Sequence, residues 1–234
     1  MIKIKKNKQI VMFIFVMMHV ITMNAHILEY IKSKMPENCV ILEAGSYDGL
    51  DTEKMATLLS KSTIYTFEPV PELFNRTINR INKYKNVYPF NLALSDQNGT
   101  AKFYSSNNSE NFTVASGSLY EPKDHLIYYP DVLFDRCIEV KTVNLDDWCQ
   151  ANNIDHIDFM WLDMQGAELK VLQSAPKILK TVQYIWTEVA VVQTYHNIPL
   201  SSEICSWLDS QGFMQILVQP TSMAEANILF GRNK

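Results

Sequence analysis

Acidic residues stand at the ends of five apolar runs that are predicted to be strands. These residues are Glu43, Glu68, Asp96, Asp163 and Glu188. Ligands of open α/β sheets bind outside the carboxyl ends of the strands, so these carboxyl groups are expected to meet at one edge of a sheet. Any single one of them could equally cap the helix that follows it. Five acidic residues at the ends of successive predicted strands indicate a cleft that binds hydroxyl groups and positive charge rather than phosphate.

The first strand runs into a glycine turn in the segment ILEAGSYDG (residues 41–49). This turn lacks the G-x-G-x-x-G pattern of dinucleotide-binding loops. A pyrophosphate needs bare backbone N–H groups without competing anions, whereas S-adenosylmethionine brings an ammonium, a carboxylate and a sulfonium. Glu43 and Asp48 beside the turn therefore favour S-adenosylmethionine. Glu68, roughly 20 residues further on, suits the ribose diol that both ligands carry.

The elements that would position these residues alternate between strands and helices. Strands are predicted at 39–44, 63–67, 87–94, 138–144, 157–164, 182–189, 213–220 and 224–232, and helices at 27–35, 55–59, 73–81, 146–153, 167–175 and 204–208. Such repeats predict an α/β fold with a doubly wound, mostly parallel sheet and helices on both faces. The last two strands are joined by a few residues and must be antiparallel, because parallel connections need about a dozen.

One long segment, residues 105–137, shows no regular period and is rich in Ser, Asn and aromatic residues. Long irregular loops in compact domains are uncommon and usually functional or disordered. We interpret this insertion as a lid over an acceptor, with aromatic rings that stack on a sugar. A partly disordered loop whose rings seal the core is the alternative.

Several segments together resemble the successive motifs of FkbM-type methyltransferases, which belong to the class I S-adenosylmethionine-dependent superfamily. They are ILEAGSYDG, YTFEPVPELFNRTINRIN, ALSD with NGTAKF, DFMWLDMQGAELKVLQSAP and WTEVAVVQTYHNIPLSSEICSWLDSQGF. The resemblance covers about residue 38 to the end. It implies a seven-stranded Rossmann-like sheet with an antiparallel C-terminal strand, S-adenosylmethionine as cofactor, and methylation of a sugar or glycan hydroxyl.

The resemblance also implies which residues hold the cofactor. They are Glu43, Ala44, Gly45, Ser46, Asp48, Gly49, Glu68, Pro69, Ser95, Asp96 and Asp163. Glu68 would hold the ribose hydroxyls, Ser95 and Asp96 would border the adenine, and Asp163 would sit under the methyl group. Family members often have D-x-E-G-x-E where this chain has Gln165 in the third place. The lost negative charge makes a metal role less expected, and no metal site is predicted.

Methyl transfer to an oxygen or nitrogen requires a base that takes the acceptor's proton. The candidates are Asp163 and Glu188, which are placed by strand ends, and His125 and His196, which lie on the expected acceptor side. A lone loop histidine is more commonly a surface residue.

Composition and the N-terminus bound the remaining possibilities. The net charge of −4 offers no electrostatic footprint for nucleic acid, and four widely spaced cysteines are typical of reduced thiols in a cytosol-like compartment.

We divide the chain into an N-terminal apolar segment and helix, residues 1–37, and a methyltransferase domain, residues 38–234. Residues 10–23 are apolar after a basic start, so they could be a leader, a membrane anchor or packed structure. We predict a cytoplasmic protein, with a membrane-associated or luminal one as the alternative. The sequence gives no oligomeric state.

The leading functional hypothesis is therefore an S-adenosylmethionine-dependent O-methyltransferase that acts on a small-molecule or glycan acceptor. An N- or carboxylate-directed methyltransferase and a non-catalytic cofactor-binding subunit remain as alternatives.

Overall fold

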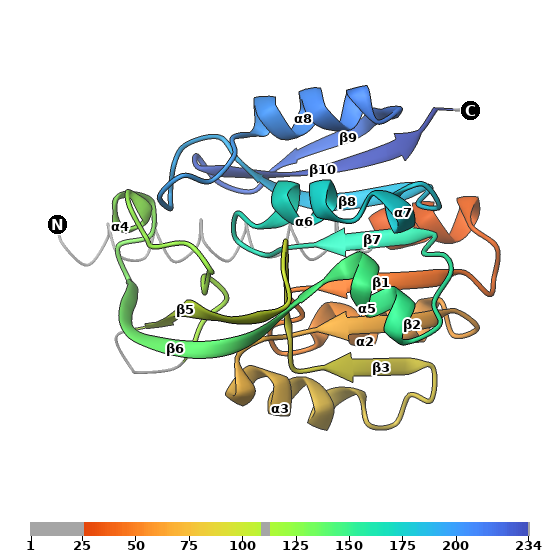
Figure 1. Cartoon of the computed structure of the whole chain (residues 1–234), viewed down its shortest axis with the longest axis horizontal. Coiled ribbons are helices and arrows are strands. Elements are labelled where there is room, and N and C mark those ends of the chain that lie inside the picture. The colour runs from red at the N-terminus through yellow and green to blue at the C-terminus, as the bar shows by residue number, and fades with distance from the viewer. Residues whose placement is uncertain (1–25, 109–112, 234) are drawn as a thin grey trace, which may run out of the picture.

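A seven-stranded sheet forms the centre of the computed structural model, which describes residues 26–108 and 113–233 (Figure 1). In spatial order its strands are β3 (Val87–Phe90), β2 (Thr63–Phe67), β1 (Val40–Ala44), β7 (Phe159–Leu162), β8 (Tyr184–Ala190), β10 (Glu225–Arg232) and β9 (Phe213–Pro220). Strand β10 is antiparallel to both of its neighbours, and the other pairings are parallel. The predicted fold class is confirmed, and the last strand inserts between β8 and β9.

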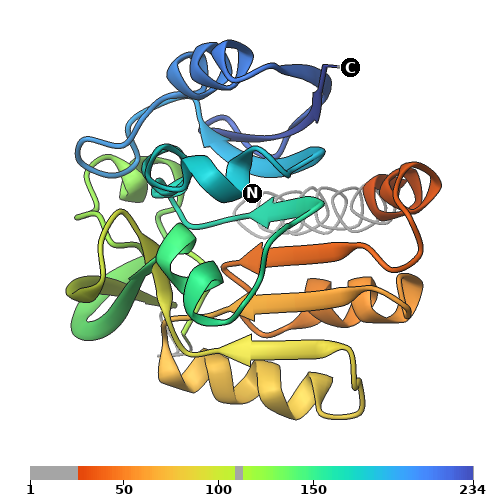
Figure 2. The same ribbon diagram turned by 45° about the vertical axis from the view of Figure 1, so that its right-hand side comes forward.

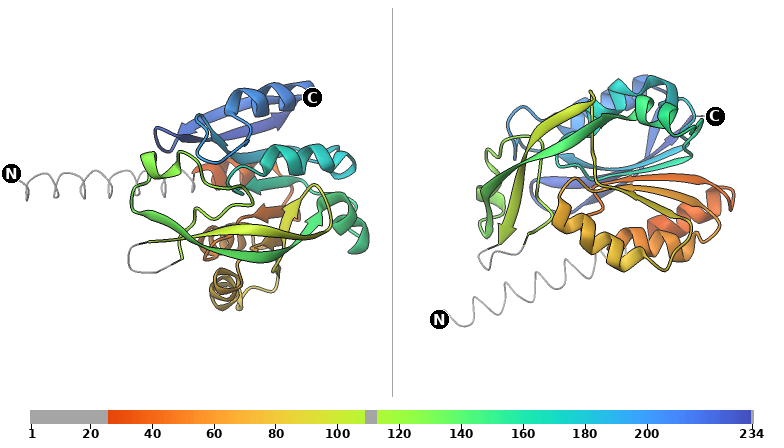
Figure 3. Two further views of the ribbon diagram at one scale, coloured as in Figure 1. Left: turned by 60° about the vertical axis from the view of Figure 1, so that its left-hand side comes forward. Right: turned by 60° about the horizontal axis from the view of Figure 1, so that its bottom comes forward.

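Helices cover both faces of this sheet (Figure 3). One face carries α5 (Leu145–Ala151), α6 (Glu168–Ser174), α7 (Pro176–Leu179) and α8 (Ser201–Ser210), and the other carries α2 (Leu50–Leu58), α3 (Pro71–Ile81) and the helical residues 26–34. Successive side chains of a strand point to opposite faces, so Ile41 and its neighbour Leu42 belong to different cores. The central strand β7 is therefore buried along its whole length.

A second, three-stranded sheet lies beyond the carboxyl ends of the parallel strands (Figures 1 and 2). Its order is β4 (Ala93–Ser95), β6 (Val132–Asn144) and β5 (Gly99–Asn108), with β5 antiparallel and β4 parallel to β6. The four-residue helix α4 (His125–Tyr128) precedes β6. Phe103 and Val140 pack on Val70 and Leu73, which fixes this sheet to the start of α3.

Two predictions about this region are wrong. Residues 87–94 are not one strand but β3 and the start of β4, which belong to different sheets. The break lies at Asn91, whose side-chain amide donates to the carbonyl oxygens of Glu68 and Pro69 at 2.8 and 3.0 Å. The segment 105–137 is also less irregular than expected, because β5 continues to Asn108 and β6 begins at Val132.

The structure tests only some of the predictions for the N-terminal residues. The predictions for residues 1–25, including the apolar run 10–23, concern residues outside the described ones. Ile27, Leu28 and Ile31 are almost completely buried against α2 and the sheet, so residues 26–34 share the core of the main sheet. The boundary between 1–37 and 38–234 stays a prediction. No helix among the described residues is long and apolar enough to cross a membrane.

Candidate active site

The strand register places four predicted site residues in one row. Ala44 of β1 is paired with Phe67 of β2 and with Leu162 of β7, and Leu162 is paired with Thr187 of β8. The residues that follow these four along the chain are Gly45, Glu68, Asp163 and Glu188. The carboxyl ends of neighbouring parallel strands thus bring one glycine and three acids to the same edge.

Gly45 allows the loop after β1 to touch the end of β7. The N–H groups of Gly45 and Ser46 donate to the carbonyl oxygen of Phe67 at 2.9 and 3.1 Å. Gly45 has a φ of +91°, and a Cβ atom there would lie 1.8 Å from the main-chain oxygen of Asp163. Only glycine combines this dihedral with so close an approach.

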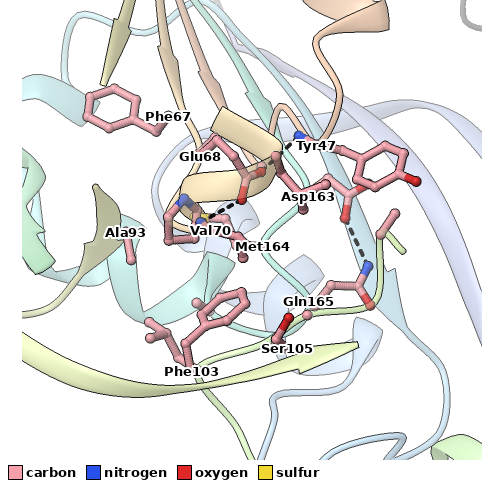
Figure 4. A pocket seen from close by; sticks show the side chains of 18 of the residues that line it. Tyr47, Phe67, Glu68, Val70, Ala93, Phe103, Ser105, Asp163, Met164 and Gln165 are labelled. Carbon is pink, nitrogen blue, oxygen red and sulfur yellow. Dashed lines mark hydrogen bonds between the residues drawn. The ribbon is translucent and has the colours of Figure 1, made fainter. Parts of the chain in front are cut away.

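Glu68 presents a buried carboxyl group at the wall of a cavity (Figure 4). One of its oxygens accepts a hydrogen bond from the N–H of Tyr47 and the other from that of Val70, both at 2.9 Å. Burial raises the pKa of Glu68 to about 8, against the opposing effect of the two N–H groups. A carboxylate oxygen has two lone pairs, so each oxygen retains the capacity to accept from a ligand hydroxyl.

The cavity has an empty volume of about 670 Å³, which includes the open solvent at its mouth. Apolar residues line one part of it, and Glu68, Ser105, Asp163 and Gln165 line another (Figure 4). Among the described residues that line it, none is Lys, Arg or His. A phosphate group would therefore find acidic side chains and no cation here.

A glutamine amide joins two of the acids. Nε2 of Gln165 donates to Oδ1 of Asp163 at 2.9 Å and to Oε2 of Glu188 at 2.5 Å. Burial raises the pKa of Asp163 and raises that of Glu188 well above its usual range, where the neighbouring Asp163 charge adds to the effect. Burial therefore favours a proton on at least one of the two carboxyl groups.

Gln165 is itself held in place from three directions. Its φ of +53° is left-handed, and its carbonyl oxygen accepts from Oγ of Ser118 at 2.7 Å. The hydroxyl of Tyr195 lies 2.9 Å from Oε1 of Gln165. The Glu168 carboxylate accepts from the N–H groups of Met164 and Gly166, which closes the turn around the glutamine. The amide that bridges the two acids is thus fixed by the loop and by distant segments.

Two acids of the first loop do not reach the cavity, which corrects our reason for excluding a dinucleotide. Glu43 is 1 % exposed, and its Oε2 accepts from the hydroxyls of Thr52 and Thr66 at 2.5 and 2.6 Å. Burial raises its pKa to about 7. Asp48 forms an ion pair with Arg80 at 2.9 Å. Among the described lining residues, the absence of cations and the position of Asp163 beside the Gly45 turn now carry the argument against a pyrophosphate.

The other predicted cofactor residues divide into two groups. Ala44, Gly45, Glu68, Pro69 and Asp163 line the cavity. Ser46, Asp48, Gly49, Ser95 and Asp96 do not. Ser46 lies against Thr77, Gly49 precedes α2, and Ser95 bonds to Asp96, which pairs with Lys170 at 3.1 Å. The cofactor roles of all these residues remain predictions.

The two histidines lie away from the cavity. His125 is 1 % exposed, is packed between the rings of Tyr129, Phe134 and Tyr195, and has no hydrogen bond to either ring nitrogen. Burial lowers its pKa to about 4, so the ring is neutral at physiological pH. His196 is exposed. Neither placement supports a role as the base, and both roles stay untested predictions.

Sequence reasoning missed several residues of the site. Tyr47 and Val70 position Glu68, and Phe103 and Ser105 reach the cavity from the second sheet. Tyr195 holds Gln165 from 30 residues away in the chain. The departure at Gln165 was a visible signal for the bridge, since the amide stands where family members often have a carboxylate.

The cavity fits S-adenosylmethionine. Glu68 can accept from ribose hydroxyls, the apolar part can cover an adenine, and acidic groups without a cation suit a ligand with an ammonium and a sulfonium. This sheet order and this site define a class I S-adenosylmethionine-dependent methyltransferase.

The fold recurs in precorrin-6y C5,15-methyltransferase from Geobacter metallireducens GS-15 (TM-score 0.50, 9% identity, 90% of this chain and 87% of that one). It also recurs in the Methanococcus jannaschii fibrillarin pre-rRNA processing protein (TM-score 0.50, 12% identity, 85% and 69%). These likenesses concern the fold alone.

The chain belongs to the FkbM methyltransferase family, because the methyltransferase FkbM domain matches residues 43–214. It is 32% identical over 198 residues to the 2-O-methyltransferase NoeI of Sinorhizobium fredii, which covers 83% of this chain and 80% of that protein. It is 23% identical over 164 residues to the hexuronic acid methyltransferase AglP of Haloferax volcanii, with 70% and 61% covered. The family assignment made from the sequence is confirmed.

Proposed function

We propose that this methyltransferase transfers its methyl group to a hydroxyl oxygen of a sugar or glycan. The names of the two relatives support this acceptor class, since one is a 2-O-methyltransferase and the other acts on hexuronic acid. The observation that carries the proposal is the Gln165 amide, which joins Asp163 at the cavity wall to the carboxyl group of Glu188 at the end of the neighbouring strand. Such a pair suits an acceptor that must lose a proton.

The cofactor supplies an activated methyl group on its sulfonium. The protein therefore has to hold the cofactor, orient the acceptor and remove the acceptor's proton. We assign Glu68 to the ribose hydroxyls and the turn at Gly45 to the remainder of the cofactor. The fixed position of the Gln165 amide keeps Asp163 and Glu188 at a constant separation. Glu188 is our candidate base, because Gln165 holds its carboxyl group close to that of Asp163 and burial raises its pKa, which makes the ionised form a stronger base.

Calorimetry tests the cofactor assignment first. We expect S-adenosylhomocysteine to bind and NADH not to bind. In Glu68→Gln, an amide N–H would oppose one of the two backbone N–H donors, and we expect affinity for S-adenosylhomocysteine to fall about tenfold. Glu139→Gln removes an exposed carboxylate on β6 and is the matched control. Binding of NADH without binding of S-adenosylhomocysteine would contradict the assignment.

Methyl transfer to sugars tests the acceptor. We expect Glu188→Gln to lower kcat about 10²–10⁴-fold while the affinity for S-adenosylhomocysteine is retained, as for loss of a general base. In Asp163→Ala, loss of turnover with retained affinity would support a catalytic role, and loss of both would make Asp163 a cofactor ligand. Cofactor binding without transfer to any sugar would refute the proposed acceptor class.

A further inference from the structure

Ser105 of β5 presents a buried hydroxyl group to the cavity (Figure 4). The residue is 3 % exposed, and its Oγ has no hydrogen-bond partner among the described residues. Folded proteins rarely leave a buried polar group without a partner, because the group has lost its hydrogen bonds to water. A hydroxyl that is unpaired at the wall of a cavity is therefore available to a ligand.

The other hydroxyl and amide groups that line the cavity donate to the protein itself. The hydroxyls of Tyr47 and Ser106 donate to main-chain carbonyl oxygens at 3.3 and 2.9 Å, and that of Thr113 donates to a carboxylate of α3 at 3.0 Å. Both amide hydrogens of Gln165 are used, because Nε2 donates to two carboxyl groups. Of the described hydroxyl and side-chain amide groups in the lining, Ser105 is the one whose hydrogen is free for a ligand.

The strand that carries Ser105 is tied to the turn at Gln165. Its neighbour Tyr104 exchanges main-chain hydrogen bonds with Ser118 at 2.8 and 3.1 Å, and Oγ of Ser118 donates to the carbonyl oxygen of Gln165 at 2.7 Å. The pairing of β5 with β6 shifts register between Ser105 and Asn107, and such bulges re-aim side chains next to active sites. These contacts fix the position of Ser105 relative to the turn whose amide bridges the two acids.

The position of Ser105 favours the acceptor over the cofactor as its ligand. Glu68, which we assign to the ribose, is held by N–H groups of the loop after β1 and of the residue before α3, whereas Ser105 belongs to the second sheet. The carboxyl groups of the lining can accept hydrogen bonds from a sugar, and the Ser105 hydroxyl can donate one. Hydrogen bonds at two oxygens orient a sugar more firmly than one, as transfer in line with the methyl group requires.

We propose that Ser105 is a positioning residue for the acceptor, and that its hydroxyl donates to a sugar oxygen next to the hydroxyl that is methylated. The inference rests on the proposed function and adds a residue to its acceptor site. The reacting hydroxyl then faces the carboxyl group of Asp163 at the cavity wall, while Ser105 holds the neighbouring oxygen.

The test is Ser105→Ala in the full chain. Affinity for S-adenosylhomocysteine is measured by calorimetry, and initial rates of methyl transfer give KM for methyl glycosides of a neutral hexose, a 2-amino-2-deoxyhexose and a hexuronic acid. We expect the variant to keep its affinity for S-adenosylhomocysteine within twofold and to raise the KM of the best glycoside about fivefold, as for loss of one hydrogen bond. Ser202→Ala, at an exposed position of α8, is the matched control and should change neither quantity.

Urea unfolding separates this role from a structural one. Because Oγ of Ser105 has no partner in the described protein, Ser105→Ala should keep or raise the urea midpoint. Ser106→Ala removes a hydroxyl that donates to the carbonyl oxygen of Val114, so its midpoint should fall. An equal fall in Ser105→Ala would mean that the Ser105 hydroxyl serves the fold, and it would overturn the inference.

The remaining outcomes are separable. If S-adenosylhomocysteine does not bind, or if it binds and none of the glycosides is methylated, the proposed function fails and the inference fails with it. If a glycoside is methylated and Ser105→Ala leaves its KM unchanged, the proposed function stands and the role of Ser105 is refuted. Loss of affinity for S-adenosylhomocysteine in Ser105→Ala would assign the hydroxyl to the cofactor and refute the role equally.

Discussion

The main-chain oxygen of Asp163 occupies the space where a side chain at Gly45 would begin. The separation from an added Cβ atom would be 1.8 Å, and the φ of +91° is unfavourable for any residue but glycine. The loop after β1 and the end of β7 are therefore in main-chain contact at the wall of the cavity. This contact fixes the position of both residues at the cavity wall.

Gly45→Ala is expected to lose cofactor binding and stability together. Left-handed strain costs about 1–2 kcal/mol, and the forced separation of β1 from β7 costs about 1–3 kcal/mol more. Urea unfolding and calorimetry with S-adenosylhomocysteine measure the two effects. Gly212→Ala is the matched control, since Gly212 has a φ of +83° but its Cβ would meet no atom closer than 3.9 Å. It should lose stability from strain alone and bind normally; equal binding by Gly45→Ala would disprove the role of the contact.

Stability of the ligand-free protein is expected to fall as the pH rises from about 5 to 8. The pKa of buried Glu43 is about 7, above its ordinary 4.5, so the folded state holds the proton more tightly than the unfolded chain. Its contribution is complete below pH 4.5 and lost as the pH rises through 7. Glu68, Glu168 and Glu225 act in the same direction.

Glu43→Gln should flatten this pH dependence by up to ~1.4 kcal/mol per pH unit. The amide oxygen can still accept from Thr52 and Thr66, so the fold should be kept. The free energy of unfolding at pH 5, 6.5 and 8 provides the measurement, with Glu139→Gln as the exposed control. An unchanged slope in Glu43→Gln would mean that Glu43 titrates normally in the folded protein.

Gln165→Glu is expected to impair turnover in a pH-dependent manner. It replaces the N–H donor between Asp163 and Glu188 with a third carboxyl group, which repels both unless it is protonated. We expect kcat/KM to fall at least tenfold at pH 8 and to recover in part at pH 6. A pH profile of kcat/KM tests this, and full activity at pH 8 would show that the bridge does not matter for turnover.

His125→Leu is expected to keep activity and to improve tolerance of acid. Because the pKa of the buried ring is about 4, below its ordinary 6.5, its contribution to stability is full above pH 6.5 and lost as the pH falls toward 4. Urea unfolding at pH 7 and 4.5 should show a gain for the variant mainly at the lower pH. His196→Leu, at an exposed position, should change neither stability nor rate; a large loss of kcat in either variant would restore that histidine as a base candidate.

The row of strand-end residues could be predicted because it depends on local patterns. Apolar runs that end in Glu68, Asp163 and Glu188 indicate buried parallel strands, and parallel strands share one carboxyl edge. The direction of each side chain could not be predicted in the same way. Glu43 points away from the cavity because the hydroxyl groups of Thr52 and Thr66 donate hydrogen bonds to its carboxyl group on the other face of the sheet.

The second sheet could not be predicted because its strands do not show an apolar pattern that reflects burial. Much of β6 is exposed, and β5 is rich in Ser and Asn near its end, so backbone pairing rather than an apolar face defines them. The residues that hold Gln165 in place could not be predicted from the sequence either. Ser118 and Tyr195 lie 47 and 30 residues from it in the chain, and no local period relates them.

Strand β10 has a consequence for the order of events during synthesis. Its place between β8 and β9 leaves the far edge of β8 without its partner until Arg232 has left the ribosome. That is roughly 40 residues after β8 itself, or about 2–8 s at ordinary translation rates. Glu188 and Glu225 come together only then, so the sheet around Glu188 is complete only after β10 has paired with β8. A nascent chain halted before β10 should expose an open strand edge, which is a site for misassembly or for a chaperone.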